Sequence, residues 1–217
     1  MRLVVLGRQG SGKGTQCVLL SRYYAVPHIS TGDMLRSAIK AGTPIGLKVR
    51  EIIERGALIP DDVVTDMVFN RLAEGDIRNL GFILDGFPRT VAQAEALEQM
   101  LGEPGLDRAV ELDAPSELTI RRLAARRVCS DCGAIYSTHK PPKFNWTCDI
   151  CGGEVVQRED DREESIRKRL ALYDTETLPV VRWYEKRSLL SRITGTGSQS
   201  AVLKRIQKEL ASVAPHR

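Results

Sequence analysis

The sequence of 217 residues lacks any long hydrophobic run. No apolar segment approaches the roughly 18 residues that a membrane-spanning helix needs. The chain starts Met1-Arg2 without an apolar leader, and 28% of its residues are charged. These features predict a cytoplasmic protein without a membrane partner.

A strong excess of one charge is also missing, and aromatic residues make up only 5% of the chain. Lys and Arg number 32 and Asp and Glu 28, which leaves a net charge of +4. This balance favours local anion pockets over a general affinity for nucleic acid, so we predict no nucleic-acid partner. With three histidines, the chain presents no Ser/His/Asp or Cys/His nucleophilic set.

The apolar patches that do occur are short. Four are typical of buried parallel strands, residues 3–6, 82–84, 109–112 and 192–194, and residues 28–29 give a fifth. Helical patterns separate them, and we expect Asp61-Asp62 to cap one helix and Ser198 another. This alternation predicts an α/β fold with a doubly wound, five-stranded parallel sheet and ligands outside the carboxyl ends of its strands.

Two segments interrupt the alternation. Residues 30–59 are mostly helical in character, with Ser30 to Asp33 capping a helix that extends to Lys40. Residues 122–161 contain short β-prone pieces separated by glycine and proline. We interpret both as lobes inserted into a core made of residues 1–29, 60–121 and 162–217.

Residues 7–15 read Gly-Arg-Gln-Gly-Ser-Gly-Lys-Gly-Thr and directly follow an apolar run. A buried strand that opens through glycines into a helix turns backbone N–H groups and the positive helix end toward phosphates. Lys13 adds a mobile charge at the outer phosphates, and Thr15 offers a hydroxyl near the expected magnesium position. The general motif has Ser or Thr directly after the lysine, whereas Gly14 intervenes here. A glycine-rich turn with an incidental lysine is the alternative.

Four of the five cysteines form two pairs, Cys129/Cys132 and Cys148/Cys151, with fifteen residues between the pairs. This spacing is typical of a zinc ribbon, whose four thiolates close the coordination shell, so we predict a structural zinc ion. Disulfides or free thiols are the alternative. Zinc ribbons also occur in nucleic-acid binders, but this one holds few aromatics and only two lysines. Cys17 is interpreted as a small buried apolar residue.

Arginines flank the cysteine segment on both sides: Arg121, Arg122, Arg126 and Arg127 before it, and Arg158, Arg162, Arg167 and Arg169 after it. Arg122 and Arg126, four residues apart, are expected on one face of a helix. Beside a phosphate loop, such guanidinium groups can clamp phosphoryl oxygens. Asp160 and Asp161 are either their counter-charges or a cap at the hinge. Asp85 ends a buried strand, where nucleotide enzymes hold magnesium through its water shell; a turn cap is the alternative.

From Met1 to about Leu210 the chain resembles the bacterial adenylate kinases of the long-lid, zinc-containing type. The motifs that carry the resemblance are GRQGSGKGT (7–15), STGDMLR (30–36), the highly specific LDGFPRT (84–90) and DDREESIRKRL (160–170). The resemblance implies a monomer with a core, a nucleoside-monophosphate lobe (30–59) and a lid (122–161). It also implies reversible in-line transfer of the γ-phosphoryl group of Mg-ATP to AMP, which gives two ADP as the lid closes.

The resemblance assigns roles to individual residues. The ATP ligands it implies are Gly10, Ser11, Gly12, Lys13, Gly14, Thr15, Arg122, Arg126, Ile135, Tyr136 and Gly197, with Arg122 stacked on the adenine. The AMP ligands it implies are Thr31, Arg36, Ala57, Leu58, Ile59, Gly86, Phe87, Pro88, Arg89, Gln93, Arg158 and Arg169. The implied catalytic residues are Lys13, Arg89, Arg126, Arg158 and Arg169. Asp85 would hold magnesium through water, and Cys129, Cys132, Cys148 and Cys151 the zinc ion.

Two positions depart from the family pattern. Arg8-Gln9 replaces the usual small residue and proline, which predicts a less rigid loop, and Gly197 stands where many members have lysine. Kinases for UMP, CMP or GMP share the core but typically have a short lid, and Thr31 with Gln93 resembles the adenine-selecting pattern. A GTPase-type switch would need a base-reading motif such as Asn-Lys-x-Asp, which this sequence lacks.

Overall fold

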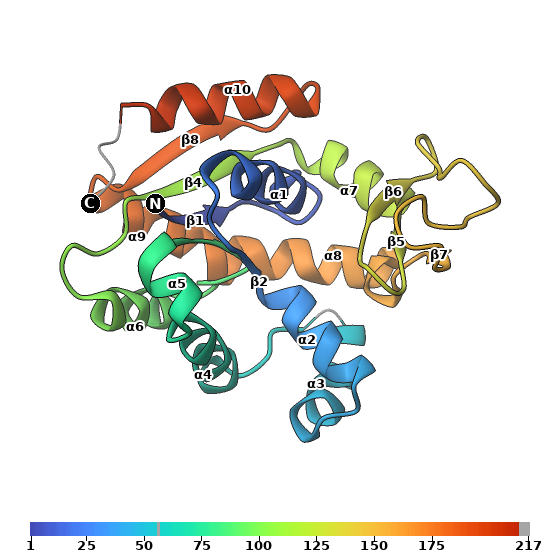
Figure 1. Cartoon of the computed structure of the whole chain (residues 1–217), viewed down its shortest axis with the longest axis horizontal. Helices are drawn as coiled ribbons and strands as arrows, with labels where there is room; N and C mark the ends of the chain where they lie inside the picture. The colour runs from blue at the N-terminus through green and yellow to red at the C-terminus, as the bar shows by residue number, and fades with distance from the viewer. Residues whose placement is uncertain (56, 213–217) are drawn as a thin grey trace.

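The computed structural model describes residues 1–55 and 57–212. Gly56 of the predicted first lobe and residues 213–217 of the predicted core lie outside the described residues. The centre of the molecule is a five-stranded sheet in the order β2-β3-β1-β4-β8 (Figure 1). Its strands are β1 (Arg2–Leu6), β2 (His28–Ser30), β3 (Phe82–Asp85), β4 (Arg108–Asp113) and β8 (Leu190–Thr194). All neighbouring strands are parallel, which confirms the predicted fold class.

Helices cover both faces of this sheet (Figure 1). One face carries α1 (Lys13–Tyr24) and α10 (Gln199–Leu210); the other carries α4 (Asp61–Leu72), α6 (Val91–Leu101) and α9 (Leu178–Lys186), and α5 (Gly75–Leu80) leads from α4 to β3. Leu3 and Val5 pack with the first group of helices, while Val4 and Leu6 pack with the second. Successive side chains of a strand point to opposite faces, so a strand buried on both faces reads as a continuous apolar run.

The strand order places two loops side by side at the carboxyl ends of the strands. After β1 the chain runs to β2 at the sheet edge and returns through β3, and it then crosses β1 to reach β4. The strand order therefore reverses at β1, and the loops after β1 and β3 open side by side at the carboxyl ends of the strands. Ligands of open parallel sheets bind at such a switch point.

The first inserted segment is helical, as predicted. It consists of α2 (Thr31–Lys40) and α3 (Pro44–Glu54). The Ser30 hydroxyl accepts a 3.3 Å hydrogen bond from the backbone N–H of Asp33, which confirms the predicted N-cap. Buried Leu35 and Val49 belong to the apolar cluster that continues into the core.

The second inserted segment lies at the far end of the molecule from β8 and α9 (Figure 1). Helix α7 (Ser116–Ala125) leads into an antiparallel sheet of order β6-β5-β7, formed by β5 (Arg126–Cys129), β6 (Ile135–Ser137) and β7 (Val155–Val156). The chain returns through the 3₁₀ turn η1 (Glu159–Asp161) and α8 (Glu163–Leu172), and the π-helical turn η2 (Tyr173–Thr177) joins α8 to α9. Helices α7 and α8 thus connect this small sheet to the core.

Two local predictions are wrong, and a third is confirmed. Helix α4 begins at Asp61 without a side-chain cap, because the Asp61 carboxylate instead accepts hydrogen bonds from Thr90 Oγ1 and Gln93 Nε2 at 2.5 and 2.8 Å. Arg126 does not share a helical face with Arg122, because α7 ends at Ala125 and Arg126 is extended at the start of β5. The Ser198 cap is confirmed by its hydrogen bond from Ala201 N at 3.2 Å.

Within residues 1–55 and 57–212, no helix has the length and apolar character of a membrane span.

Candidate functional site

The glycine-rich loop joins β1 to α1. Gly12 is the N-cap of α1 with φ 105°, a conformation that glycine adopts without strain, and no side chain caps the helix. A Cβ atom at Gly10 would lie 2.5 Å from the carbonyl oxygen of Thr119, so only glycine lets α7 approach the loop this closely. No side chain therefore caps the first backbone N–H groups of α1, which is the arrangement that an anion site at a helix N-terminus requires.

Lys13 lies at the centre of this loop. Its Nζ donates hydrogen bonds to the carbonyl oxygens of Gly7 and Arg8, at 2.5 and 3.0 Å. Burial lowers the pKa of Lys13 to about 8; the charge of Asp85 opposes this shift and that of Arg89 adds to it. A buried ammonium group with such a depressed pKa gains strongly from a nearby phosphate.

The Arg8 side chain anchors the loop in a way that its sequence did not predict. Its Nη2 lies 2.7 Å from Asp174 Oδ1, and its guanidinium lies over the ring of Tyr173, 5.5 Å from the centroid. Both partners belong to η2, the turn that follows α8. The loop is therefore tied through Arg8 to η2, the turn between α8 and α9.

The loop opens onto a cavity of about 420 Å³. All the residues predicted to bind ATP line it, from the loop (Gly10 to Thr15), from α7 and β5 (Arg122, Arg126), from β6 (Ile135, Tyr136) and from the last core loop (Gly197). Arg122 Nη1 donates to the carbonyl oxygens of Ser11 and Gly195, at 3.1 and 3.3 Å. Segments far apart in the sequence thus form one wall.

A second cavity of about 70 Å³ is lined in part by the same arginines as the first, namely Arg36, Arg89 and Arg169. Of the residues predicted to bind AMP, Thr31, Ala57 and Ile59 line the smaller cavity, and Gly86, Pro88 and Arg158 line the larger one.

Three of the predicted AMP residues, Leu58, Phe87 and Gln93, line neither cavity. Phe87 is fully buried in the core against Phe69. The Gln93 amide donates to Asp61 and accepts from the backbone N–H of Arg89 at 2.7 Å, so it holds the arginine loop in place.

Positive charge is concentrated between the two cavities. Burial lowers the pKa of Arg89 to about 10, and the charge of Arg169 adds to this effect. Burial, followed by the charges of Arg36 and Arg126, likewise lowers the pKa of Arg158 to about 10. Among the described residues, the buried Nε of Arg158 has no hydrogen-bond partner. A bound polyanion would offset the repulsion among these buried guanidinium groups, so the site is suited to bind one.

Two aspartates neutralise part of this charge. Asp161 accepts hydrogen bonds from Arg126 Nε and Nη2, at 2.7 and 2.5 Å, and Asp160 lies 3.0 Å from Arg169 Nη1. Both aspartates are buried in η1. Of the two alternatives left by the sequence, Asp160 and Asp161 are therefore counter-charges. Asp33, which the sequence analysis names only as part of a helix cap, pairs with Arg36 at 2.5 Å and lies 3.7 Å from Arg158. Its three-residue spacing from Arg36 was the available signal for this pairing.

Asp85 ends β3, as predicted, and lines the large cavity. A Cβ atom at Gly14 would lie 3.4 Å from Asp85 Oδ2, which is an ordinary contact distance, so the first turn of α1 passes beside this carboxylate. A carboxylate beside the phosphate loop and Thr15 is a suitable outer ligand for a hydrated magnesium ion.

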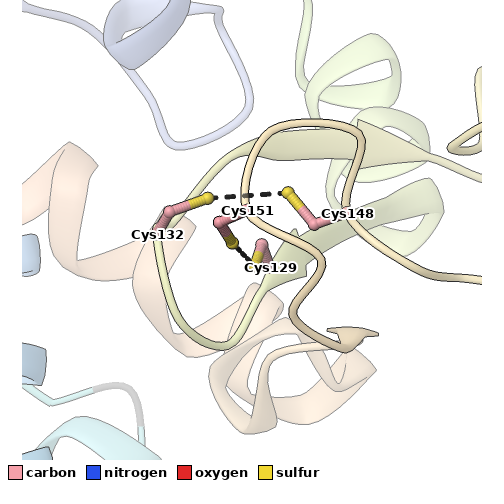
Figure 2. A group of neighbouring side chains, drawn as sticks. All are labelled: Cys129, Cys132, Cys148 and Cys151. Carbon is pink, nitrogen blue, oxygen red and sulfur yellow. Dashed lines mark hydrogen bonds between the residues drawn. The ribbon is translucent and has the colours of Figure 1, made fainter.

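The four paired cysteines of the second inserted segment converge (Figure 2). The Cys129 and Cys151 sulfurs lie 3.4 Å apart, the Cys132 and Cys148 sulfurs lie 3.6 Å apart, and all four lie within 4.8 Å of one another. These separations suit a tetrahedral zinc ion with Zn–S bonds of about 2.3 Å. No disulfide forms among the described cysteines.

Tyr136 links this cluster to the large cavity, which it also lines. Its hydroxyl accepts a hydrogen bond from the backbone N–H of Asp149 at 2.8 Å and lies 3.4 Å from Cys148 Sγ. Hydrogen bonds, that of Tyr136 first, lower the pKa of Cys148 to about 6. A thiol that ionises this readily is a good zinc ligand.

The fold and this site together define a nucleotide-binding protein of the phosphate-loop class. The profile of a family described as adenylate kinase matches residues 5–189. Proteins named adenylate kinase from Thermodesulfovibrio yellowstonii and Caldicellulosiruptor saccharolyticus are 51% and 45% identical to the chain. The alignments cover 91% of the chain and 93% of the relative in the first case, and 97% and 99% in the second. A third such protein, from Moorella thermoacetica, is 47% identical over 97% of the chain and 98% of the relative. The chain belongs to the adenylate kinase family.

Proposed function

We propose that the chain is an ATP:AMP phosphotransferase that reversibly converts Mg-ATP and AMP into two ADP. The observation that supports this proposal most directly is that the phosphate loop lines the same cavity as Arg89, Arg158 and Arg169. Two nucleotides placed end to end would bring their phosphates together there. The family membership of the whole chain supports the same assignment.

Transfer is direct in this proposal. An oxygen of the AMP phosphate attacks the γ-phosphorus in line, and the bond to the β-phosphate oxygen breaks as ADP leaves. Lys13, Arg89, Arg126, Arg158 and Arg169 would stabilise the charge that spreads over the equatorial oxygens. Asp85 would hold magnesium through its water shell, and the ion would neutralise charge on the β- and γ-phosphates. Arg122 would stack on the ATP adenine, and the AMP ligands would be those predicted from the sequence.

We propose that residues 30–59 and 122–161 act as lobes that close over the two substrates and exclude water. Contacts between these segments support closure: Lys40 of α2 lies 2.8 Å from Asp131 beside the cysteine cluster, and Arg158 approaches Asp33. The zinc ion would be structural and held by the four cysteines. The monomeric state, the cytoplasmic location and the absence of nucleic-acid and membrane partners are also part of the proposal.

A coupled assay of ADP formation tests the activity. With ATP as donor, a panel of AMP, UMP, CMP and GMP is compared at equal concentration. We expect two ADP per ATP consumed with AMP and far slower turnover with the others. Faster phosphorylation of another monophosphate would assign the chain to that substrate. Salt-sensitive oligonucleotide binding without phosphotransfer would instead favour a zinc-ribbon nucleic-acid binder.

Removal of zinc is expected to melt the lid before the core. The lid's own apolar cluster contains only Cys129, Cys148 and Val155 as buried members, which is too small to hold the fold without the metal. We expect chelation to lower the lid melting temperature by roughly 5–10 °C. Trp146 reports on the lid and Trp183 on α9 of the core, so Trp183→Phe and Trp146→Phe variants separate the two transitions by fluorescence. Complete loss of activity in a metal-free protein that is still folded would contradict a structural role.

ATP binding is expected to take up a proton at alkaline pH. Because the pKa of Lys13 is about 8 in the free protein, its side chain is mostly the neutral amine at pH 9. Bound phosphates would raise this pKa and so restore the charged ammonium form. The apparent ATP affinity should fall roughly tenfold between pH 7 and pH 9, while binding at pH 9 takes up about one proton. Calorimetry in two buffers of different ionisation enthalpy measures this uptake. Lys13→Met should abolish it, and equal affinity at both pH values would refute the expectation.

The contact between Arg8 and η2 is expected to position the phosphate loop. The Arg8 and Asp174 side chains are 25% and 50% exposed, so their pairing is screened and its effect modest. We expect Arg8→Ala to weaken ATP binding about fivefold, or by about 1 kcal/mol, with little change in kcat. In a double-mutant cycle, Asp174→Ala should add little to Arg8→Ala. Additive effects of the two variants would show that they act separately.

A further inference from the structure

Three side chains from α1, β2 and β3 meet at one point, and the proposed function uses only one of them. Cys17 lies on α1, His28 begins β2 and Asp85 ends β3. Their sulfur, nitrogen and oxygen donor atoms all lie within 4.8 Å of one another. The Asp85 Oδ2 to His28 Nε2 distance is 3.6 Å. The cluster is separate from the four cysteines of the lid.

The imidazole is the unusual member of this group. His28 Nε2 is buried and has no hydrogen-bond partner among the described residues. Buried polar atoms normally find a partner, and one that does not calls for an explanation, such as an ion. The Cys17 side chain on α1 is fully buried, and its sulfur lies within 4.8 Å of the donor atoms of His28 and Asp85. A ligand at this point would satisfy all three side chains.

The donor set selects the kind of ligand. Thiolate, imidazole and carboxylate together favour a borderline or soft divalent ion such as Zn²⁺ over Mg²⁺, which prefers oxygen ligands and retains its water. Three protein ligands also leave a fourth position of a tetrahedral ion open. Of the three residues, Asp85 lines the large cavity, so an ion bound to its carboxylate would lie beside the space proposed for the nucleotide phosphates.

We propose that Cys17, His28 and Asp85 form a second metal site, which takes Zn²⁺ and thereby withdraws Asp85 from the nucleotide. Binding releases the thiol proton of Cys17 to solvent, and His28 binds through Nε2 with its remaining proton on Nδ1. The Lys13 ammonium donates to the carbonyl oxygens of Gly7 and Arg8, whose partial negative charges offset part of its positive charge. Zn²⁺ at this site is an inhibitor, because it occupies the carboxylate that would hold magnesium. This last consequence rests on the proposed function, whereas metal binding itself does not.

Equilibrium dialysis of the protein with its lid already loaded with zinc tests the site. The protein is dialysed without nucleotide against buffered free Zn²⁺, and bound metal is counted per chain. We expect two ions per chain for the natural sequence and one for Cys17→Ala and for His28→Gln. Loss of one ligand should lower the affinity for the second ion at least ~10–100-fold. His139→Gln, which removes an exposed histidine, is the matched control and should keep both ions.

His28→Gln removes a ligand at the start of a strand and guards against a folding defect in Cys17→Ala, whose side chain lies in the core. A single bound ion in the natural sequence overturns the proposal, as does a second ion that both variants keep with unchanged affinity. In the phosphotransfer assay, both variants should also require at least ~10-fold more Zn²⁺ for half-inhibition than the natural sequence. If dialysis finds the second ion but Zn²⁺ does not inhibit, the site stands and the assigned role of Asp85 fails.

Discussion

Lys13→Met is expected to lower kcat roughly 10³-fold at saturating ATP and AMP. Methionine keeps most of the unbranched side chain and removes the ammonium group, with its charge and its hydrogen bonds to the carbonyl oxygens of Gly7 and Arg8. Among the residues that line the large cavity, Lys13 is the one lysine, and it lies at the start of the helix that would hold the phosphates. Its ammonium interacts most strongly with the phosphoryl group as charge migrates, so the loss should appear in kcat rather than only in KM.

The thermal stability of Lys13→Met should stay the same or rise, although its turnover falls. Burial of the Lys13 charge lowers its pKa, which means that the folded protein pays to keep this group charged at neutral pH. Lys13→Met should therefore melt at the same temperature as the natural sequence or higher. Lys168→Met is the matched control: Lys168 pairs with Glu164 on an exposed face of α8, and its loss should leave turnover unchanged. Near-normal turnover of Lys13→Met at saturating substrate would contradict the assigned role.

Arg89→Ala is expected to reduce kcat by about 10³–10⁵-fold, the range known for arginines that stabilise a migrating phosphoryl group. Arg89 lines both cavities, and its position is fixed at several points. Its Nε donates to Gly86 O at 2.8 Å, its backbone N–H donates to Gln93, and its carbonyl accepts from Thr177 Oγ1 at 3.1 Å. A guanidinium held in this way needs little reorganisation when charge develops beside it.

The variant Arg89→Lys separates charge from geometry. Lysine restores the positive charge but cannot form the two parallel hydrogen bonds of a guanidinium, so we expect it to recover only a small part of the lost rate. Arg167→Ala removes an exposed arginine paired with Glu163 and serves as the control. Steady-state kinetics at saturating substrate, together with a melting curve for each variant, measure the effect. Full activity of Arg89→Lys would show that charge alone suffices.

Sequence reasoning found the elements that local patterns encode. The continuous apolar run at Leu3 to Leu6 predicts a strand buried on both faces, and β1 is such a strand. The Ser30 and Ser198 caps depend only on neighbours three residues away, and both form. The cysteine spacing likewise predicts the four-sulfur cluster, because each pair lies within one tight turn.

The predictions that failed depend on contacts distant in sequence. Asp61 looked like a helix cap because only its own neighbours were visible, whereas its partners Thr90 and Gln93 lie on another element. Similarly, a four-residue spacing put Arg126 on a helix, but its pairing with Asp161 and the start of β5 place it in a strand. The contact between Arg8 and η2 joins residues 166 positions apart, beyond what local patterns can predict.

The central claim is that the phosphate loop and the arginines together hold two nucleotides end to end in one cavity. A calorimetric titration with a mimic in which five phosphates join two adenosines measures this most directly. We predict that one molecule binds per chain and prevents the binding of both ATP and AMP, and that Lys13→Met and Arg89→Ala each weaken it. Failure of the folded protein to bind the mimic, or binding that leaves the AMP site free, would contradict the account.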